Sequence, residues 1–284
     1  MRLKSALRRG VAAAVIAGIV VSSGIPAYAA RWNIADGDIT VEGASDESGN
    51  YNKVKQGDKD FKKDEGETVI TGKSKEHTVT IDTSGGKVDV TFDDLKIDVS
   101  GKKEGDGSDD SPVDAGKAAV TVKGDHDAAI ELDGDNKLKS GSGNAGLEKN
   151  KHESEGTLTI KDDNGKDGSL TAEGGDDGAG IGGGIGSTGS SITIRGGAVE
   201  AVGGSNAAGI GDGAGPWSEP DPDTPPSNPN NIIICGDAEV TAKAGSQTTD
   251  AKVPAIGGKY GEVPTENLSD DEHKVTGGRL TRLN

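Results

Sequence analysis

The chain has 284 residues, a formal net charge of −17, 47 glycines and only 2% aromatic residues. So few bulky side chains cannot fill a conventional globular core, and an acidic surface repels phosphate backbones, so nucleic-acid binding is not expected. A single cysteine, Cys235, excludes an intramolecular disulfide, and the fold must be stabilised in another way.

The first 29 residues have the three parts of a secretory signal peptide. A basic start that includes Arg8 and Arg9 precedes an apolar run at 11–21, and residues 27–29 read Ala-Tyr-Ala, a typical cleavage site. The apolar run is shorter than the roughly 20 residues that a membrane-spanning helix needs, which favours cleavage after Ala29 over a membrane anchor. We therefore expect a secreted protein without a membrane span after cleavage; retention at the cell surface is the alternative.

Short β-branched runs continue along the first part of the mature chain, and clusters of glycine and aspartate separate them. These runs predict strands at 38–41, 68–70, 78–81, 88–90, 95–99, 119–122 and 130–132. They repeat less cleanly than the later segments. We interpret them as the opening turns of a repeat protein, because terminal repeats usually deviate from the others.

The clearest signal is an internal repeat in the second half of the chain. Residues 170–184 match 199–213 position by position at an offset of 29, and a third copy with a longer gap spans 240–258. Each copy contains one isoleucine within a glycine-rich stretch. A short β-branched run precedes each copy, at 158–160, 192–194 and 232–234.

The repeated unit alternates with period two, which places its aliphatic residues inside and residues such as Thr193 and Glu200 outside. A unit this short cannot bury its own apolar row, but stacked neighbours bury it between them. The sequence therefore predicts an all-β fold, a single-stranded parallel β-helix for which a right-handed coil is favoured.

Four segments follow from this interpretation. They are the signal peptide (1–29), atypical solenoid turns (30–115), glycine-rich β-helix repeats (116–270) and a C-terminal tail (271–284). Six of the ten prolines fall between 215 and 230. Because proline cannot occupy a central strand, we expect a proline-rich loop inserted there.

One glycine motif requires a choice between two interpretations. Residues 178–183 match G-x-G-x-x-G, which in dinucleotide-binding proteins joins a strand to a helix. Here another predicted strand follows, and the same element recurs near Gly209. The motif therefore indicates a structural turn.

Asp162, Asn164 and Asp167 are the favoured candidates for a calcium site, because calcium prefers several oxygen ligands on a flexible loop. The segment does not fit an EF-hand, since Lys166 stands where a ligand is needed. Aspartate and asparagine also favour turns for conformational reasons, so a purely structural role stays open.

No catalytic constellation is recognisable, and the candidate site residues are therefore those suited to binding a carbohydrate. Trp217, in the proline-rich loop, and Tyr260 are favoured among the aromatic residues, ahead of Trp32 and Tyr51. Aromatic rings stack on sugars, although loop aromatics also serve as packing anchors. Arg195 is the candidate cation, with a charge on a solvated sheet face as the alternative. Cys235 aligns with it and is assigned no chemistry.

Several motifs carry a resemblance to a known group of proteins. They are the segments 130–136, 144–148 and 168–172 and the repeated Ala-Gly-Ile-Gly. With them, the run from about Ala118 to Gly258 resembles the carbohydrate-binding-type β-helix domains of bacterial surface proteins and the glycine-rich repeats of adhesins. The resemblance implies a β-helix that binds a plant or bacterial cell-wall polysaccharide or a host glycan, with calcium as a possible aid. It assigns no binding residue.

We therefore expect a secreted or cell-surface, non-catalytic polysaccharide-binding protein. One alternative is an adhesin or structural stalk that binds a protein or a host surface. Another is an acidic-polysaccharide lyase with Arg195 as its base. A lyase on a β-helix needs arginine, lysine and acidic residues gathered in one groove, and the sequence by itself shows no such cluster.

Overall fold

The computed structural model describes residues 29–47, 49–64, 66–101, 116–165, 167–215, 230–246, 253–258, 261–265, 268 and 279–283. In these ranges the chain forms β-strands and a short 3-10 helix, η1 (Ile34–Asp36), but no α-helix, which confirms the expected all-β class. Within the same ranges, the structure contains no helix long and apolar enough to cross a lipid bilayer.

The strands form two sheets in which most neighbours run parallel. In order of pairing, the larger sheet contains β18 (Ile232–Ile234), β15 (Ile192–Ile194), β12 (Leu158–Lys161), β9 (Ala128–Asp133), β7 (Val88–Asp98), β10 (Asp135–Lys139), β13 (Ser169–Glu173), β16 (Ala198–Val202), β19 (Glu239–Lys243) and β22 (Arg279–Leu283). Two further strands join it through β7, namely β5 (Thr68–Ser74) and, paired with β5, β1 (Ala30–Asn33).

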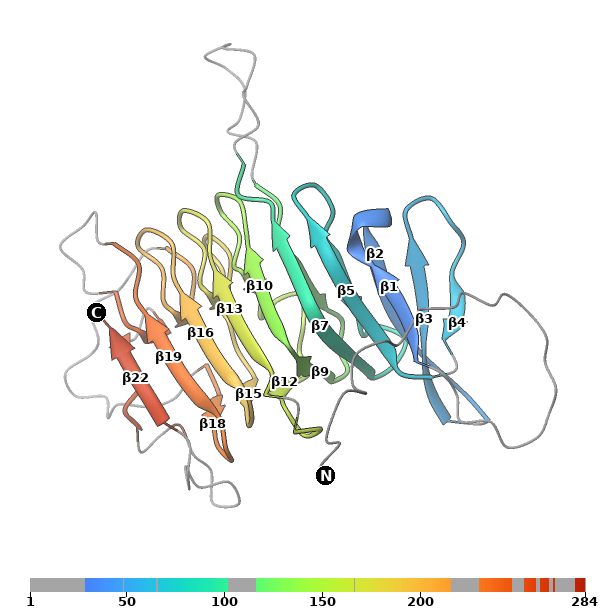
Figure 1. The fold of residues 1–284 in the computed structure, drawn as a ribbon. Helices are drawn as coiled ribbons and strands as arrows, with labels where there is room; N and C mark the ends of the chain where they lie inside the picture. The colour runs from blue at the N-terminus through green and yellow to red at the C-terminus, as the bar shows by residue number, and fades with distance from the viewer. Residues whose placement is uncertain are drawn as a thin grey trace, which may run out of the picture.

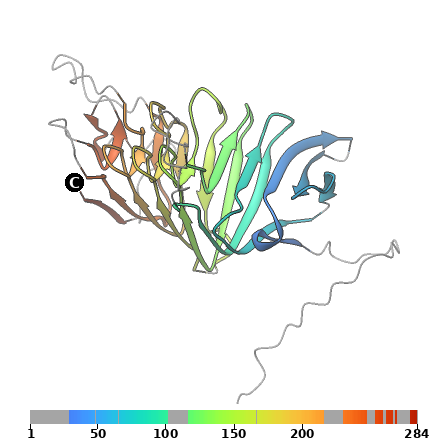
Figure 2. The same ribbon diagram turned by 90° about the horizontal axis from the view of Figure 1, so that it is seen from above.

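The smaller sheet contains the remaining strands. In order of pairing they are β21 (Gly261–Glu262), β20 (Ile256–Gly258), β17 (Ile210–Gly211), β14 (Ile181–Gly182), β11 (Leu147–Glu148), β8 (Val120–Lys123), β6 (Val79–Asp82), β2 (Ile39–Asp46), β3 (Gly49–Gln56) and β4 (Lys62–Asp64). From β9 onward, one circuit of the chain comprises two strands of the larger sheet and one of the smaller sheet. Successive circuits follow one another along the molecule from its blue N-terminal part to its red C-terminal part (Figures 1 and 2).

The predicted repeat sets the register between circuits. Ile181 pairs with Ile210, which in turn pairs with Ile256, and Leu170 pairs with Val199. The offset of 29 read from the sequence is therefore the offset between two hydrogen-bonded circuits.

Aligned aliphatic side chains form the core between the sheets. Ile160, Ile194 and Ile234 are opposite one another in β12, β15 and β18, and all three are buried. Burial of each such side chain contributes about 1.5–3 kcal/mol, so long rows of them replace the missing aromatic residues. Thr193 and Glu200 face outward, as the alternation predicts.

The Ile-Gly elements need glycine because their backbones approach one another closely. Gly182, Gly211 and Gly257 have φ angles of 135°, 132° and 134°. A Cβ on Gly211 would lie 1.8 Å from the carbonyl oxygen of Gly257. The G-x-G-x-x-G segment thus belongs to a strand and its turns, and no helix follows it in the residues that the structure describes.

From β9 onward, a corner divides the larger-sheet part of each circuit into two strands. At the equivalent position β7 continues as one strand, although the sequence predicts two strands, at 88–90 and 95–99. Asp94 marks the bend within β7 with a φ of 52°, and Gly134, with a φ of 63°, separates β9 from β10. Asn136 is fully buried beside this bend. Its amide accepts a hydrogen bond from Leu95 N and donates to the Asp133 and Ser169 carbonyls, which ties three consecutive circuits together.

The N-terminal part departs from the regular pattern. β2 pairs parallel with β6, as a stacked repeat requires, but β3 pairs antiparallel with both β2 and β4. The sequence did not predict this antiparallel extension.

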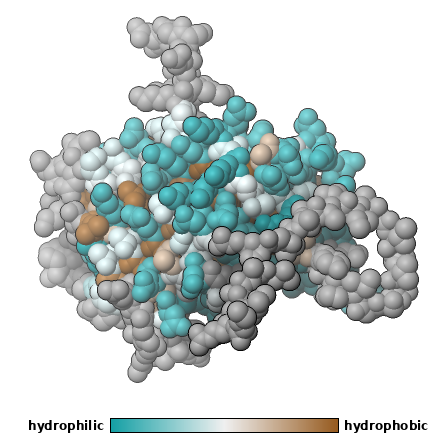
Figure 3. Space-filling model, viewed as in Figure 1, coloured by the Kyte–Doolittle hydropathy of each residue, from teal (hydrophilic) through white to brown (hydrophobic). Residues whose placement is uncertain are grey.

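The molecular face seen in Figure 1 is mostly hydrophilic over β5, β7 and β10 (Figure 3).

Candidate functional site

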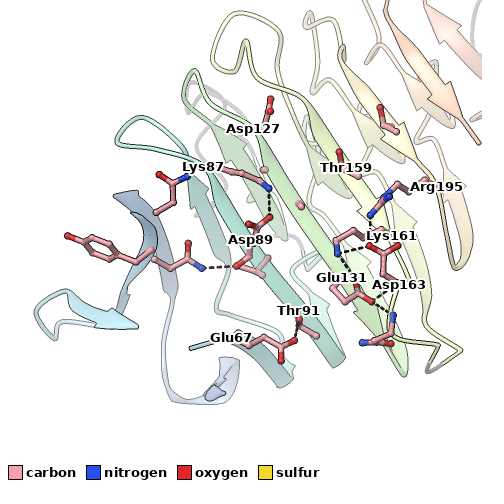
Figure 4. A pocket seen from close by; sticks show the side chains of 18 of the residues that line it. Glu67, Lys87, Asp89, Thr91, Asp127, Glu131, Thr159, Lys161, Asp163 and Arg195 are labelled. Atoms are coloured by element: carbon pink, nitrogen blue, oxygen red, sulfur yellow. Dashed lines mark hydrogen bonds and ion pairs between the residues drawn. The ribbon is translucent and has the colours of Figure 1, made fainter. Parts of the chain in front are cut away.

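A groove of about 940 Å³ lies on the outer face of β7, β9, β12 and β15, and residues of β3 contribute to one of its ends (Figure 4). Its floor follows one row of outward side chains at paired positions of neighbouring strands: Asp89, Ala129, Thr159 and Thr193. Neighbouring strands lie about 4.8 Å apart, so four strands give the groove a length of about 14 Å. The groove therefore crosses the strands and extends along the direction in which the circuits stack.

A row of ionised side chains borders this floor. Glu131 pairs with Lys161 across β9 and β12, and Arg195 follows one circuit later, directly after β15. The Lys161 Nζ lies 2.8 Å from Glu131 Oε2 and 2.9 Å from Asp163 Oδ2. Asp163 also pairs with Arg195. We call Glu131, Lys161, Asp163 and Arg195 the charged row, and Figure 4 shows it along one side of the groove.

In the charged row, hydrogen bonds hold Glu131 and Lys161 in place, whereas Asp163 and Arg195 are more exposed. Glu131 Oε1 accepts hydrogen bonds from the backbone N–H groups of Asp163 and Asn164, which fixes their turn to the sheet. Partial burial by itself lowers the pKa of Lys161, but hydrogen bonds to Glu131 and Asp163 outweigh it, so this pKa lies above its usual value. Asp163 and Arg195 are about half exposed, at 50% and 44%. Water weakens such a pair, so both groups can exchange it for a ligand.

An aromatic ring and a hydroxyl–carboxylate pair mark the opposite end of the groove. Tyr51 comes from β3, and the Lys63 ammonium lies 4.1 Å from the centre of its ring. Thr91 Oγ1 donates a hydrogen bond to Glu67 Oε1 at 2.5 Å. This end therefore offers both a ring face and hydrogen-bonding groups.

The structure places some of the residues that the sequence singled out. Arg195 lines the groove, whereas Trp217 and Tyr260 lie outside the described residues, so their proposed roles stay predictions. Trp32 donates a hydrogen bond from its indole to Asp64 at 3.1 Å and packs against the core, which is an anchoring role.

The three calcium candidates occupy one turn but form separate contacts. Asp162 Oδ2 accepts a hydrogen bond from Gly168 N at 3.0 Å, and the amide of Asn164 donates to Asp133. Asp167 is exposed. In the described ranges no three His, Cys, Asp or Glu side chains are grouped so that they could hold a metal ion. Calcium binding stays a prediction.

The alignment of Cys235 with Arg195 is confirmed. The Cys235 N–H donates to the Ile194 carbonyl and the Arg195 N–H donates to the Ile160 carbonyl, each at 2.9 Å. The two residues thus occupy the same place in successive circuits. The thiol is buried and also lines the groove.

Sequence reasoning identified Arg195 but missed Glu131 and Lys161 beside it. The offsets between the three positions are unequal, 30 and then 34 residues, which hides them from a search for a fixed period. A usable signal existed, because each of the three directly follows an isoleucine of a predicted strand. Aligning those isoleucines would have brought Glu131, Lys161 and Arg195 together.

Comparisons with protein-family models, with curated proteins and with solved structures found no match for this chain. The site is therefore interpreted from its own geometry. That geometry is an open, elongated groove lined by hydroxyls, carboxylates, two lysine amines and a guanidinium. Such a lining can donate to and accept hydrogen bonds from a ligand that carries many hydroxyl groups.

Proposed function

We propose that the chain is a single-stranded parallel β-helix that binds a polysaccharide in the groove without cleaving it. The parallel, in-register pairing of successive circuits supports the coil. The signal-peptide pattern supports secretion, with a plant or bacterial cell wall or a host glycan as the source of the ligand.

The observation that carries this proposal is the shape of the groove together with its lining. A linear polymer fits a groove that runs across four strands and is open along its length. Thr159 and Thr193 on the floor match sugar hydroxyls, and Asp163 and Arg195 at the rim supply charge-assisted hydrogen bonds. The ring of Tyr51 can stack on a sugar at one end.

Filling the floor of the groove tests the proposal. Thr193→Arg places a long side chain there, and Thr241→Arg changes the same residue type at an outward position of β19 as a matched control. We expect retention of the protein on at least one member of an insoluble glycan panel, loss of retention for Thr193→Arg, and normal retention for Thr241→Arg. Equal retention of all three proteins, or no retention on any glycan, would contradict binding in the groove.

One observation favours a second function, that of an acidic-polysaccharide lyase. Arg195 and Lys161 lie beside Glu131 and Asp163 in one groove, which is the kind of cluster that was not evident from the sequence. Because these four groups neutralise one another, we favour binding. Release of unsaturated sugar from polygalacturonate, abolished by Arg195→Ala, would establish the lyase instead.

A further inference from the structure

Three lysines stand opposite one another on a second outer face of the larger sheet. Lys73 in β5 pairs with Lys96 in β7, and Lys96 pairs with Lys137 in β10. Neighbouring strands are about 4.8 Å apart, so the row repeats one positive charge per strand. All three line a second hollow, of about 440 Å³. We call them the lysine row.

The lysine row places like charges opposite one another, whereas the adjacent row on the same face places opposite charges there. Like charges directly opposite each other destabilise a sheet, whereas opposite charges stabilise it. In the adjacent row, Asp98 pairs with Lys139 and Lys139 pairs with Glu173, so the signs alternate. The Lys139 Nζ lies 3.0 Å from Glu173 Oε2. The same face of the sheet therefore balances its charges in one row and leaves them unbalanced in the next.

Neighbouring carboxylates compensate the lysine row only weakly. Lys96 lies 3.8 Å from Asp135, which is 63% exposed, and such a contact is worth little in water. In the part of the chain that the structure describes, Lys73 and Lys137 have no carboxylate within ion-pairing distance. A concentration of positive charge of this kind is unexpected in a chain with a net charge of −17.

We propose that the lysine row binds an anionic glycan, a linear polymer with a carboxylate or sulfate on successive sugars, laid across β5, β7 and β10. One sugar ring is comparable in length to one strand spacing, so successive anions can face successive lysines. The aliphatic stems of the lysines form walls along which sugar rings can lie.

This inference does not depend on the groove. The two hollows share no lining residue, and in β7 and in β9–β10 they lie on strand segments before and after the bends at Asp94 and Gly134. A variant that blocks the groove and a variant that neutralises the lysine row should therefore affect binding separately.

The test uses residues 30–284, the chain expected after removal of the signal peptide, and a triple variant, Lys73→Gln, Lys96→Gln and Lys137→Gln. A matched control replaces three exposed lysines elsewhere, Lys59, Lys117 and Lys151, by glutamine and changes the net charge equally. Affinities for polygalacturonate and dextran sulfate are measured in EDTA, so that calcium bridges cannot contribute, with neutral dextran and single-stranded DNA as comparison ligands. Polygalacturonate and dextran sulfate separate carboxylate from sulfate as the preferred group.

We expect the triple variant to lose about tenfold or more in affinity for the polyanionic glycan while the control variant stays close to the parent protein. Added salt should weaken parental binding, because exposed charges are screened. An equal loss in both variants, an unchanged triple variant, or tighter binding of DNA would overturn the inference. Loss in Thr193→Arg instead of the triple variant would move the anionic glycan to the groove. If the triple variant does not fold, Lys96→Gln alone should show a smaller loss in the same direction.

Discussion

Lys149 is a buried amine that forms no ion pair with a carboxylate among the residues that the structure describes, and we expect it to make the stability of the protein depend on pH. The residue follows β11 and is 0% exposed. Its Nζ donates hydrogen bonds to the carbonyl oxygens of Ser154 and Ser190, each at 3.0 Å. Burial lowers the pKa of Lys149 from 10.5 to about 8, and the charge of Asp127 offsets only part of this effect.

The direction of the pH dependence follows from comparing the pKa of Lys149 in the folded and the unfolded protein. The unfolded chain keeps the usual pKa and binds the proton more tightly, so below pH 8 both states are charged and the folded state carries the full penalty of burial, about 3 kcal/mol. Between pH 8 and 10.5 the folded protein loses the proton first, and its stability rises with pH. We expect Lys149 to add roughly 2–3 kcal/mol to the free energy of unfolding between pH 7 and pH 10.

The assay compares urea unfolding of the parent protein and Lys149→Met at pH 7, 8, 9 and 10. Methionine has a similar shape and no charge, so other titrating groups cancel in the difference between the two proteins. The difference should change by roughly 2–3 kcal/mol in favour of the parent protein as the pH rises. Parallel stability curves would refute the reasoning, because they would mean that the amine is not desolvated in the folded state.

Two further predictions concern the residues that hold neighbouring circuits together. Asn136→Ala leaves the buried Leu95 N–H without its acceptor and should lower the free energy of unfolding by about 2–4 kcal/mol in urea; a loss below about 1 kcal/mol would show that the corner does not depend on this amide. Gly211→Ala directs a Cβ at the Gly257 carbonyl and should destabilise by more than about 2 kcal/mol, whereas Gly101→Ala, with nothing within 4 Å, should be neutral. Equal midpoints for the two alanine variants would contradict the close approach.

The sequence was sufficient to predict the regular part of the fold because a stacked repeat converts an offset in sequence directly into a register in space. Residues 170 and 199 match in sequence and are paired in the sheets. The antiparallel strands β3 and β4 were not predictable in the same way. They occur once, so no second copy reveals them, and their polar residues carry only a weak alternation.

The two proposed binding rows were hidden for a related reason. The residues of each row come from circuits of unequal length. They therefore occupy paired positions on neighbouring strands but have no fixed spacing in the sequence. Lys73 and Lys96 are 23 residues apart, whereas Lys96 and Lys137 are 41 residues apart. That these charged side chains are neighbours becomes evident only when the pairing of the strands is known.

Net charge alone therefore does not decide which ligands this surface could bind. The total of −17 describes an average over turns rich in aspartate and sheet faces where lysine collects. A ligand that extends across several strands contacts one column of residues, and at the length scale of a column the charge can have the opposite sign. Exposed charges more than about 8–10 Å away are largely screened at physiological salt, so the local column dominates the attraction. An acidic chain can therefore hold an acidic polymer, provided that its cations are placed in register.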